Sequence, residues 1–237
     1  MTLYLHEVHS VVGTAEDEFE SAFRDPGGWM DVLGRAGDAR LLYYANQAHG
    51  TGLAYRVVTI TAVADGAAWE RLARSVDGGG LAPLVARIDK VRHGVVSKML
   101  LPVSWSPLNE VDLSAVASTP ADHEPTLFME DTGWPSSSLE DYIDFWGRDY
   151  HPMLQSHPED RRLLEIQACW TVAYGAGRRP EGILWQRIHN LQILMGLFSR
   201  EVTPEQKAPG SYMDRALKFR DQWESRLLRT ASWSPRW

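Results

Sequence analysis

Apolar and polar residues alternate along several short stretches of the first half of the chain, and stretches with a helical period separate them. Period-two alternation is typical of a strand with one buried face, whereas apolar residues at i, i+3 and i+7 indicate an amphipathic helix. Trp69, Leu72 and Val76 follow this second pattern. We expect strands at 3–12, 41–47, 55–63 and up to Trp105, and helices from Thr14, over about 66–76 and around 81–88.

The second half repeats this order of elements. Strands are predicted at 127–132, 163–173 and 182–189, and a helix is predicted from Ser138. Two more apolar stripes of helical period precede the last strand. The first stripe is Leu191, Leu194, Met195 and Phe198, and the second is Tyr212, Ala216, Phe219 and Trp223.

The two halves also share sequence at their ends. Residues 97–107 (SKMLLPVSWSP) return as 225–235 (SRLLRTASWSP), and residues 2–7 (TLYLHE) are echoed by 126–131 (TLFMED). We therefore predict one module written twice, with domains at 1–108 and 126–237. The segment 109–125 is rich in Ala, Ser, Pro and acids and is interpreted as a surface linker.

Strand–helix–strand–strand–helix–strand is the ferredoxin-like pattern, in which helices cover one face of an antiparallel sheet. The other face needs a cover as well. Two such sheets packed face to face would bury both open faces. The predicted fold is α+β, with two ferredoxin-like modules forming an α/β barrel within one chain.

The tandem layout and the segment 146–152 (WGRDYHP) carry a family resemblance. Together they resemble NIPSNAP-like and EthD-like members of the dimeric α/β-barrel superfamily. That resemblance implies cofactor-free monooxygenases, isomerases, cyclases or lyases acting on aromatic or polyketide metabolites. It equally implies haem enzymes of the chlorite dismutase type, so the fold alone does not choose a function.

Composition excludes some partners. The net charge of −7, without a basic run, argues against nucleic acid, whose binding relies on clustered Lys and Arg. The single Cys169 rules out an intrachain disulfide, and neither an export signal nor 18 consecutive apolar residues are found. We expect a cytoplasmic protein that is not bound to a membrane. Pairing into a homodimer through outer strands or helices is left open.

Several common chemical motifs are missing from the chain. It contains no Gly-x-Gly-x-x-Gly, Walker loop, His-Glu-x-x-His or Gly-x-Ser-x-Gly. No pair of histidines has the spacing expected of metal ligands, because His6 and His9 would face opposite sides of a strand. Neither a metal nor another cofactor is therefore expected, with haem as the alternative.

Strand alternation predicts which side chains face the barrel interior. In the strand 55–63, the apolar residues Val58, Ile60 and Ala62 are assigned to the helix side. The residues then expected to face inward are Tyr4, His6, Tyr43, Ala45, Gln47, His49, Tyr55, Val57, Thr59, Thr61, Phe128, Glu130, Glu165, Gln167, Cys169, Trp185, Arg187 and His189.

From this set we predict a site for acid/base chemistry. His6 and His189 are the candidate acid and base, and Glu130 would orient them or act as a base itself. Arg187 would hold an anionic intermediate. The remaining predicted substrate contacts are Tyr43, His49, Tyr55, Glu165 and Trp185.

Structural roles are the alternative for the same residues. Glu130, Glu165 and Arg187 could form a buried ion-pair network, and His6 and His189 could be hydrogen-bonded core histidines. The predicted function is a cofactor-independent enzyme acting on a hydrophobic aromatic or polycyclic small molecule. The alternatives are a haem-binding barrel enzyme and a non-catalytic ligand-binding or assembly protein.

Overall fold

The computed structural model describes residues 1–175 and 180–237. Strands in the first half alternate with pairs of short helices. Asp65 caps the helix Gly66–Asp77 by accepting a hydrogen bond from the Ala68 amide. The elements of this half are β1 (Leu3–Val11), α1 (Glu16–Arg24), α2 (Trp29–Ala36), β2 (Ala39–Gln47), β3 (Arg56–Val63), α3 (Gly66–Asp77), α4 (Ala82–Lys90) and β4 (Arg92–Pro102).

The second half has the same strand order but more broken helices. A single-turn π-helix, Trp146–Tyr150, joins the helices Leu139–Phe145 and His151–Gln155 without interrupting the helical path. The elements are β5 (Leu127–Pro135), α5 (Leu139–Phe145), α6 (His151–Gln155), β6 (Leu164–Gly175), β7 (Gly182–Ile188), α7 (Leu191–Ser199), α8 (Pro204–Lys207), α9 (Tyr212–Ala216) and β8 (Arg220–Thr230).

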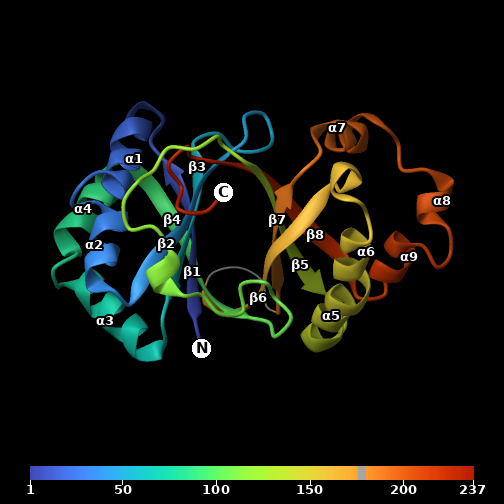
Figure 1. Ribbon diagram of the computed structural model, residues 1–237, viewed down its shortest axis with the longest axis horizontal. Helices are drawn as coiled ribbons and strands as arrows, with labels where there is room; N and C mark the ends of the chain where they lie inside the picture. Colours follow the sequence, from blue (N-terminus) through green and yellow to red (C-terminus); the bar gives the residue numbers. More distant parts are fainter. Residues whose placement is uncertain (176–179) are drawn as a thin grey trace.

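All eight strands form one closed antiparallel barrel in the order β1-β3-β2-β8-β5-β7-β6-β4 (Figure 1). Each half contributes a ferredoxin-like sheet, ordered β4-β1-β3-β2 in the first and β8-β5-β7-β6 in the second. The pairs β2·β8 and β4·β6 close the barrel between the halves. The predicted α+β barrel is thus confirmed, and the similar segments 97–107 and 225–235 lie at equivalent ends of β4 and β8. The origin of the halves by duplication and the domain boundaries stay predictions.

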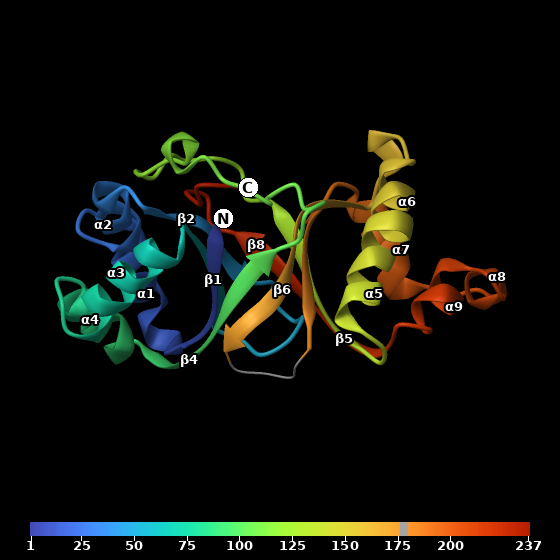
Figure 2. The same cartoon turned by 90° about the horizontal axis from the view of Figure 1, so that it is seen from below.

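The helices lie outside the barrel in two groups, α1–α4 against the first sheet and α5–α9 against the second (Figures 1 and 2). This arrangement creates three apolar clusters. One fills the barrel, including Tyr4, Trp170 and Trp185. The other two lie under the helices, around Phe23 in the first half and around Trp146 in the second.

The segment 109–125 does more than run over the surface. Val116 is buried against the barrel cluster, as is Leu108 just before the segment, whose carbonyl accepts a hydrogen bond from the Tyr4 hydroxyl at 2.6 Å. His123 stacks on the terminal Trp237 with ring centroids 4.0 Å apart. The segment and the chain terminus therefore cover one end of the barrel (Figure 2).

One predicted helix is much shorter than expected. The stripe Tyr212, Ala216, Phe219 and Trp223 indicated a helix through Trp223, but α9 ends at Ala216 and β8 begins at Arg220. Trp223 therefore projects from a strand, where it pairs with Gly133 of β5. Within the described part of the chain, no helix is long and apolar enough to cross a membrane.

Candidate active site

The predicted residues His6 and Glu130 meet inside the barrel. His6 Nε2 donates to Glu130 Oε2 at 2.7 Å, and Arg226 Nη1 donates to Glu130 Oε1 at 2.8 Å. His6 and Glu130 are each only 1% exposed. Burial by itself would raise the pKa of Glu130, but His6 and Arg226 outweigh it and lower that pKa to about 2. Glu130 is therefore a firmly ionised partner in an ion pair and a weak base.

A second buried ion pair lies nearby. Lys98 Nζ contacts Glu181 Oε1 at 2.6 Å, and the Trp134 indole donates to Glu181 Oε2 at 2.8 Å. Lys98 also lowers the pKa of Glu130 by its charge. These contacts match the alternative interpretation of an ion-pair network between the sheets. The partners in this network differ from the predicted Glu165 and Arg187, because they are Glu181, Arg226 and Lys98.

Tyr43, Trp185 and Arg187 also lie where the alternation predicted. The Tyr43 and Trp185 rings pack inside the barrel with centroids 5.1 Å apart, and Phe128 stacks on Trp185 at 5.2 Å. Burial raises the pKa of Tyr43 to about 12, partly opposed by the positive charges of Arg236 and Arg187. Aromatic rings and ion pairs thus fill the barrel interior around these residues.

Glu165 and His189 form a separate pair away from His6. His189 Nε2 donates to Glu165 Oε2 at 2.7 Å, and the two side chains are 18% and 38% exposed, respectively. Glu165 lines a cavity of about 290 Å³ together with His151 of α6. The two predicted catalytic histidines therefore belong to different sites.

The structure does not bring His49 and Tyr55 to the interior. His49 is exposed in the turn after β2, and Tyr55 is 52% exposed just before β3. The predicted facing of β3 was wrong, because Ile60 pairs directly with the inward His6 and shares its face. Val58, Ile60 and Ala62 therefore fill the barrel, while Val57, Thr59 and Thr61 face the helices.

A β-bulge changes the facing of β6 as well. The register with β7 shifts between Ile166 and Ala168, so Ala168 and Trp170 point into the barrel. Cys169, which was predicted to face inward, is instead buried in the cluster under the second set of helices. Alternation cannot reveal such a shift, because a bulge moves every later side chain to the other face.

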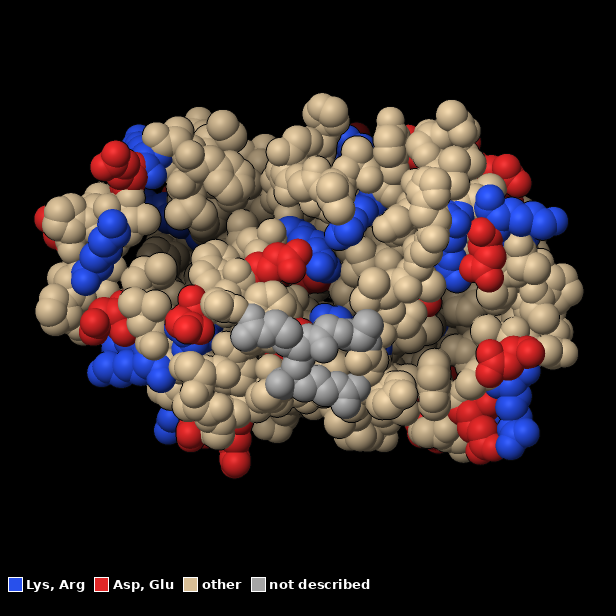
Figure 3. All heavy atoms as spheres, turned by 180° about the vertical axis from the view of Figure 1, so that it is seen from behind, with Lys and Arg blue, Asp and Glu red and all other residues tan. Residues whose placement is uncertain are grey.

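A much larger cavity lies outside the barrel in the second half. It measures about 1190 Å³ and lies between the outer face of β5, β7 and β8 and the helices α5–α9. Figure 3, in which the second half lies on the left, shows the surface hollowed on that side. We call this space the Asp131 cavity. Its lining includes Met129, Asp131, Gly133, Tyr142, Trp146, Tyr150, Leu184, Ile193, Leu197, Tyr212, Arg220 and Trp223.

Asp131 is the carboxylate in the sheet wall of this cavity. Gln186 Nε2 donates to Asp131 Oδ2 at 2.9 Å, and the Ser225 hydroxyl donates to Oδ1. Gln186 is itself oriented by the Tyr150 hydroxyl, which donates to its Oε1 at 3.0 Å. Burial raises the pKa of Asp131 above its ordinary value, although Ser225, Gln186 and Arg220 oppose the rise. Asp131 is thus a carboxylate that is fixed by hydrogen bonds and is more basic than an exposed carboxylate.

Two residues that line the same cavity carry a buried polar group without a partner. The buried Tyr142 hydroxyl and the Arg220 Nε have no hydrogen-bond partner among the described residues. The Arg220 guanidinium lies over the Trp223 ring, 4.7 Å from its centroid. Burial raises the pKa of Tyr142, and it raises that of Tyr212 to about 12. Both tyrosines therefore keep their protons and can donate hydrogen bonds.

Two facing glycines make room for the aromatic wall. Gly133 of β5 pairs with Gly182 of β7. A Cβ at Gly133 would lie 2.3 Å from the Tyr142 hydroxyl, and one at Gly182 would lie 2.7 Å from the Trp146 ring. The sheet thus leaves space that side chains from α5 and the π-helix occupy, and π-helical turns often occur at functional sites.

The Asp131 cavity was not predicted from the sequence, because its polar residues lie on strand faces that point away from the barrel interior. A signal was nevertheless present. Asp131 and Gln186 fall on the strand faces that helices cover, between apolar neighbours such as Met129 and Leu184. Polar residues at such positions need a specific partner or a function.

No family model matches the chain, and no curated protein matches it significantly. Solved structures do match over almost the whole chain. A "putative monooxygenase" from Lactobacillus acidophilus is 14% identical, with a TM-score of 0.56 over 98% of this chain and 96% of its own. An anthrone oxidase-like protein is 6% identical, with a TM-score of 0.59 over 97% and 91%. Chlorite dismutase from Candidatus Nitrospira defluvii is 5% identical, with a TM-score of 0.53 over 97% and 91%.

At these identities the similarity shows the fold alone, the α+β barrel with ferredoxin-like halves. A NIPSNAP family protein from Agrobacterium tumefaciens matches only 46% of this chain, at 16% identity and a TM-score of 0.38. Neither a family nor a function follows from this match.

The residues that line the Asp131 cavity do not suit a histidine-ligated haem. Among the residues that the structure describes, the lining of the Asp131 cavity contains no histidine. His6 is already paired with Glu130 inside the packed barrel, and His189 is paired with Glu165. Within the same described residues, no group of three His, Cys, Asp or Glu side chains is arranged to hold a metal ion.

Proposed function

We propose that this protein is an enzyme that binds a hydrophobic aromatic or polycyclic molecule in the Asp131 cavity and removes a proton from it without a bound cofactor. The observation that carries this proposal is the partly desolvated Asp131 carboxylate in the wall of an aromatic cavity of about 1190 Å³. Perturbed titratable groups in apolar pockets are typical of active sites. The base is Asp131 rather than His6, because the Nε2 atom of His6 is already hydrogen-bonded to Glu130 inside the packed barrel.

The geometry supports a role for each polar group. Asp131 would accept the proton, and its raised pKa improves it as a base near neutral pH. Gln186 and Ser225 hold its carboxylate in place. The Arg220 guanidinium and the unpartnered Tyr142 hydroxyl would stabilise the enolate or phenolate oxygen that forms.

An anthrone is a suitable probe substrate, since one neighbour of the same fold is described as anthrone oxidase-like. Loss of the proton from the methylene carbon to Asp131 gives the enolate, which is far more easily oxidised than the ketone. Dioxygen is the oxidant: one anthrone and one O₂ give one anthraquinone and one water. The protein would supply the base and the stabilised enolate, and O₂ would accept the electrons.

The test measures O₂ uptake and anthraquinone absorbance with purified protein and anthrone. Asp131→Asn should lower the rate by about 10²–10⁴-fold while anthraquinone binding, followed by tryptophan fluorescence, is retained. The matched control is Asp141→Asn, which changes an exposed aspartate on α5 outside the cavity and should keep the full rate. An equal rate in Asp131→Asn would refute the proposed base. Binding without turnover by the unmodified protein would instead support the non-catalytic ligand-binding alternative.

A further inference from the structure

The first half contains a second carboxylate–serine pair in the position equivalent to Asp131 and Ser225. Glu7 of β1 pairs in register with Ser97 of β4, as Asp131 of β5 pairs with Ser225 of β8. In both halves the serine hydroxyl donates to the carboxylate, at 3.0 Å for Ser97 and Glu7 Oε1. Among the residues that the structure describes, none donates a hydrogen bond to the other oxygen of Glu7, which lies 4.0 Å from His9 Nε2. One acceptor oxygen is thus available to a ligand.

An arginine also recurs at the equivalent place. Arg92 is the first residue of β4, as Arg220 is the first residue of β8. Arg92 is held firmly, because Nη1 donates to His9 Nδ1 at 2.8 Å, Nε donates to Asp89 at 2.8 Å and Nη2 contacts Asp89 at 2.6 Å. A guanidinium has five N–H groups, so one on Nη1 and one on Nη2 remain for a ligand.

His9 completes the polar wall in its neutral form. Because Nδ1 accepts from Arg92, the proton lies on Nε2, which donates to the Thr59 hydroxyl at 3.0 Å. Burial and the charge of Arg92 lower the pKa of His9 well below its ordinary value. His9 therefore adds no charge. Glu7 and Arg92 are the charged groups on the sheet side of the cavity, and the exposed Asp77 lies at the end of α3.

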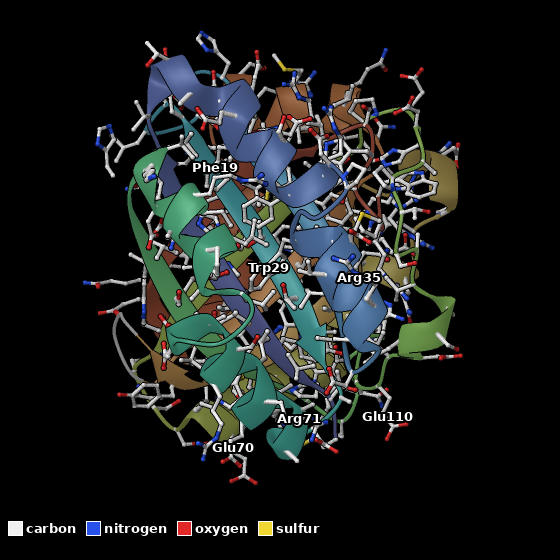
Figure 4. The ribbon with its side chains drawn as sticks, turned by 90° about the vertical axis from the view of Figure 1, so that its left-hand side faces the viewer. Phe19, Trp29, Arg35, Glu70, Arg71 and Glu110 are labelled. Carbon is white, nitrogen blue, oxygen red and sulfur yellow. The ribbon has the colours of Figure 1, made fainter. Side chains whose placement is uncertain are left out.

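These groups line a cavity of about 270 Å³ between β1, β4 and the helices α1–α4. Its other walls are apolar and aromatic, with Phe23, Trp29 and Trp69 among the lining residues. Figure 4 looks onto these helices and shows Trp29 beneath them, against the sheet. The space is under a quarter of the Asp131 cavity, which limits a ligand to about one ring.

We infer that this cavity is a second binding site, and that it takes a single-ring phenol. The phenol hydroxyl would donate to the free oxygen of Glu7, and the phenol oxygen would accept from Arg92, while the ring packs against Trp29 and Trp69. Glu7 repels an anionic ligand and Arg92 repels a cationic one, whereas a purely apolar ring would leave the second Glu7 oxygen and the remaining Arg92 N–H groups unpaired. The site is independent of the proposed reaction at Asp131.

The test uses 4-fluorophenol followed by ¹⁹F NMR, with 4-fluorotoluene as the ligand that lacks the hydroxyl. Unmodified protein and Asp131→Asn should bind 4-fluorophenol with the same Kd. Glu7→Gln should raise this Kd at least tenfold, and 4-fluorotoluene should bind at least tenfold more weakly than 4-fluorophenol. Ala73→Leu serves as a second variant, since it fills the cavity from α3 without changing a charge and remains informative if Glu7→Gln fails to fold.

The outcomes separate the two cavities. Loss of binding in Ala73→Leu with retention in Asp131→Asn supports the inference. It is overturned if the unmodified protein shows no saturable binding, if binding survives in Ala73→Leu, or if it is lost in Asp131→Asn. Equal affinity for 4-fluorotoluene would likewise overturn the assigned roles of Glu7 and Arg92. None of these results depends on anthrone oxidation.

Discussion

His6 and Glu130 hold corresponding positions on β1 and β5, and their side chains meet each other across the barrel at 2.7 Å. Because the two residues occupy equivalent positions, the approximate twofold axis that relates the two halves passes close to their contact. The same position carries an imidazole in one half and a carboxylate in the other, so the contact is complementary. It joins two sheets whose direct strand pairing is otherwise limited to β2·β8 and β4·β6.

We predict that Glu130→Gln destabilises the protein by about 3 kcal/mol at pH 7, because it leaves His6 and Arg226 without their carboxylate. The pKa of Glu130 is lowered to about 2, so its contribution is present above the ordinary value of 4.5 and is lost as the pH falls toward 2. Urea unfolding at pH 7 and pH 3 measures this. The difference between the two proteins should shrink at pH 3.

Glu224→Gln is the control for this prediction. Glu224 contacts the same Arg226 at 3.0 Å but is 47% exposed, so its loss should cost less than about 1 kcal/mol. Equal effects of the two variants would show that burial of the His6–Glu130 pair has no special energetic weight.

The elements and the strand order could be predicted because strand and helix periods are visible in each half. The side chains of β3 that face the barrel interior could not be predicted, because both faces of this strand are buried and Val57 and Val58 are equally apolar. Only the pairing of Ile60 with His6 assigns the faces, and this register is a tertiary property. In β6 the bulge near Gln167 has no sequence marker such as glycine.

The candidate site was harder to predict than the fold. Strand alternation correctly placed His6 and Glu130 on the inward face. However, candidate catalytic residues were predicted only among the side chains that face the barrel interior. The Asp131 cavity instead depends on how far the helices α5–α9 stand from the sheet. Gly133 and Gly182 let Tyr142 of α5 and Trp146 of the π-helix pack close to the sheet, and no periodic pattern expresses this packing.

Activity at the Asp131 cavity should depend on pH through Asp131. A base must be ionised, so kcat/KM should fall as the pH falls through the pKa of Asp131, which burial raises above its ordinary value. The measurement is a pH profile of anthrone oxidation. A profile that stays flat down to the pH at which an exposed aspartate titrates would contradict this assignment.

Stability should depend on Asp131 in the opposite direction from Glu130. Because folding raises the pKa of Asp131, the folded state binds more protons, and its stability decreases as the pH rises from the ordinary value through the raised one. Asp131→Asn cannot ionise. Its melting temperature relative to the unmodified protein should therefore be higher at pH 7 than at pH 4, and calorimetry at both pH values checks the sign.

Cys169 should report global unfolding. The thiol is free and fully buried, and burial raises its pKa well above the ordinary value, so little thiolate forms in the folded protein. We expect a thiol reagent such as DTNB to react stoichiometrically in urea and very slowly in buffer. In Glu130→Gln the slow reaction should accelerate by about 100-fold, which corresponds to 3 kcal/mol. Rapid reaction in buffer would contradict the burial of Cys169.

Gly133→Ala should close the Asp131 cavity from its floor. The new Cβ would lie 2.3 Å from the Tyr142 hydroxyl and 2.7 Å from the Tyr142 ring, so this side chain must move toward the space that the ligand would occupy. We expect a destabilisation of about 1–3 kcal/mol, as for other overpacked cores, and a loss of anthraquinone binding. Gly94→Ala on β4 is the matched control, because a Cβ there meets nothing within 4 Å. Thermal unfolding and fluorescence titration of both variants check the prediction, and unchanged anthraquinone affinity in Gly133→Ala would remove Tyr142 from the proposed binding site.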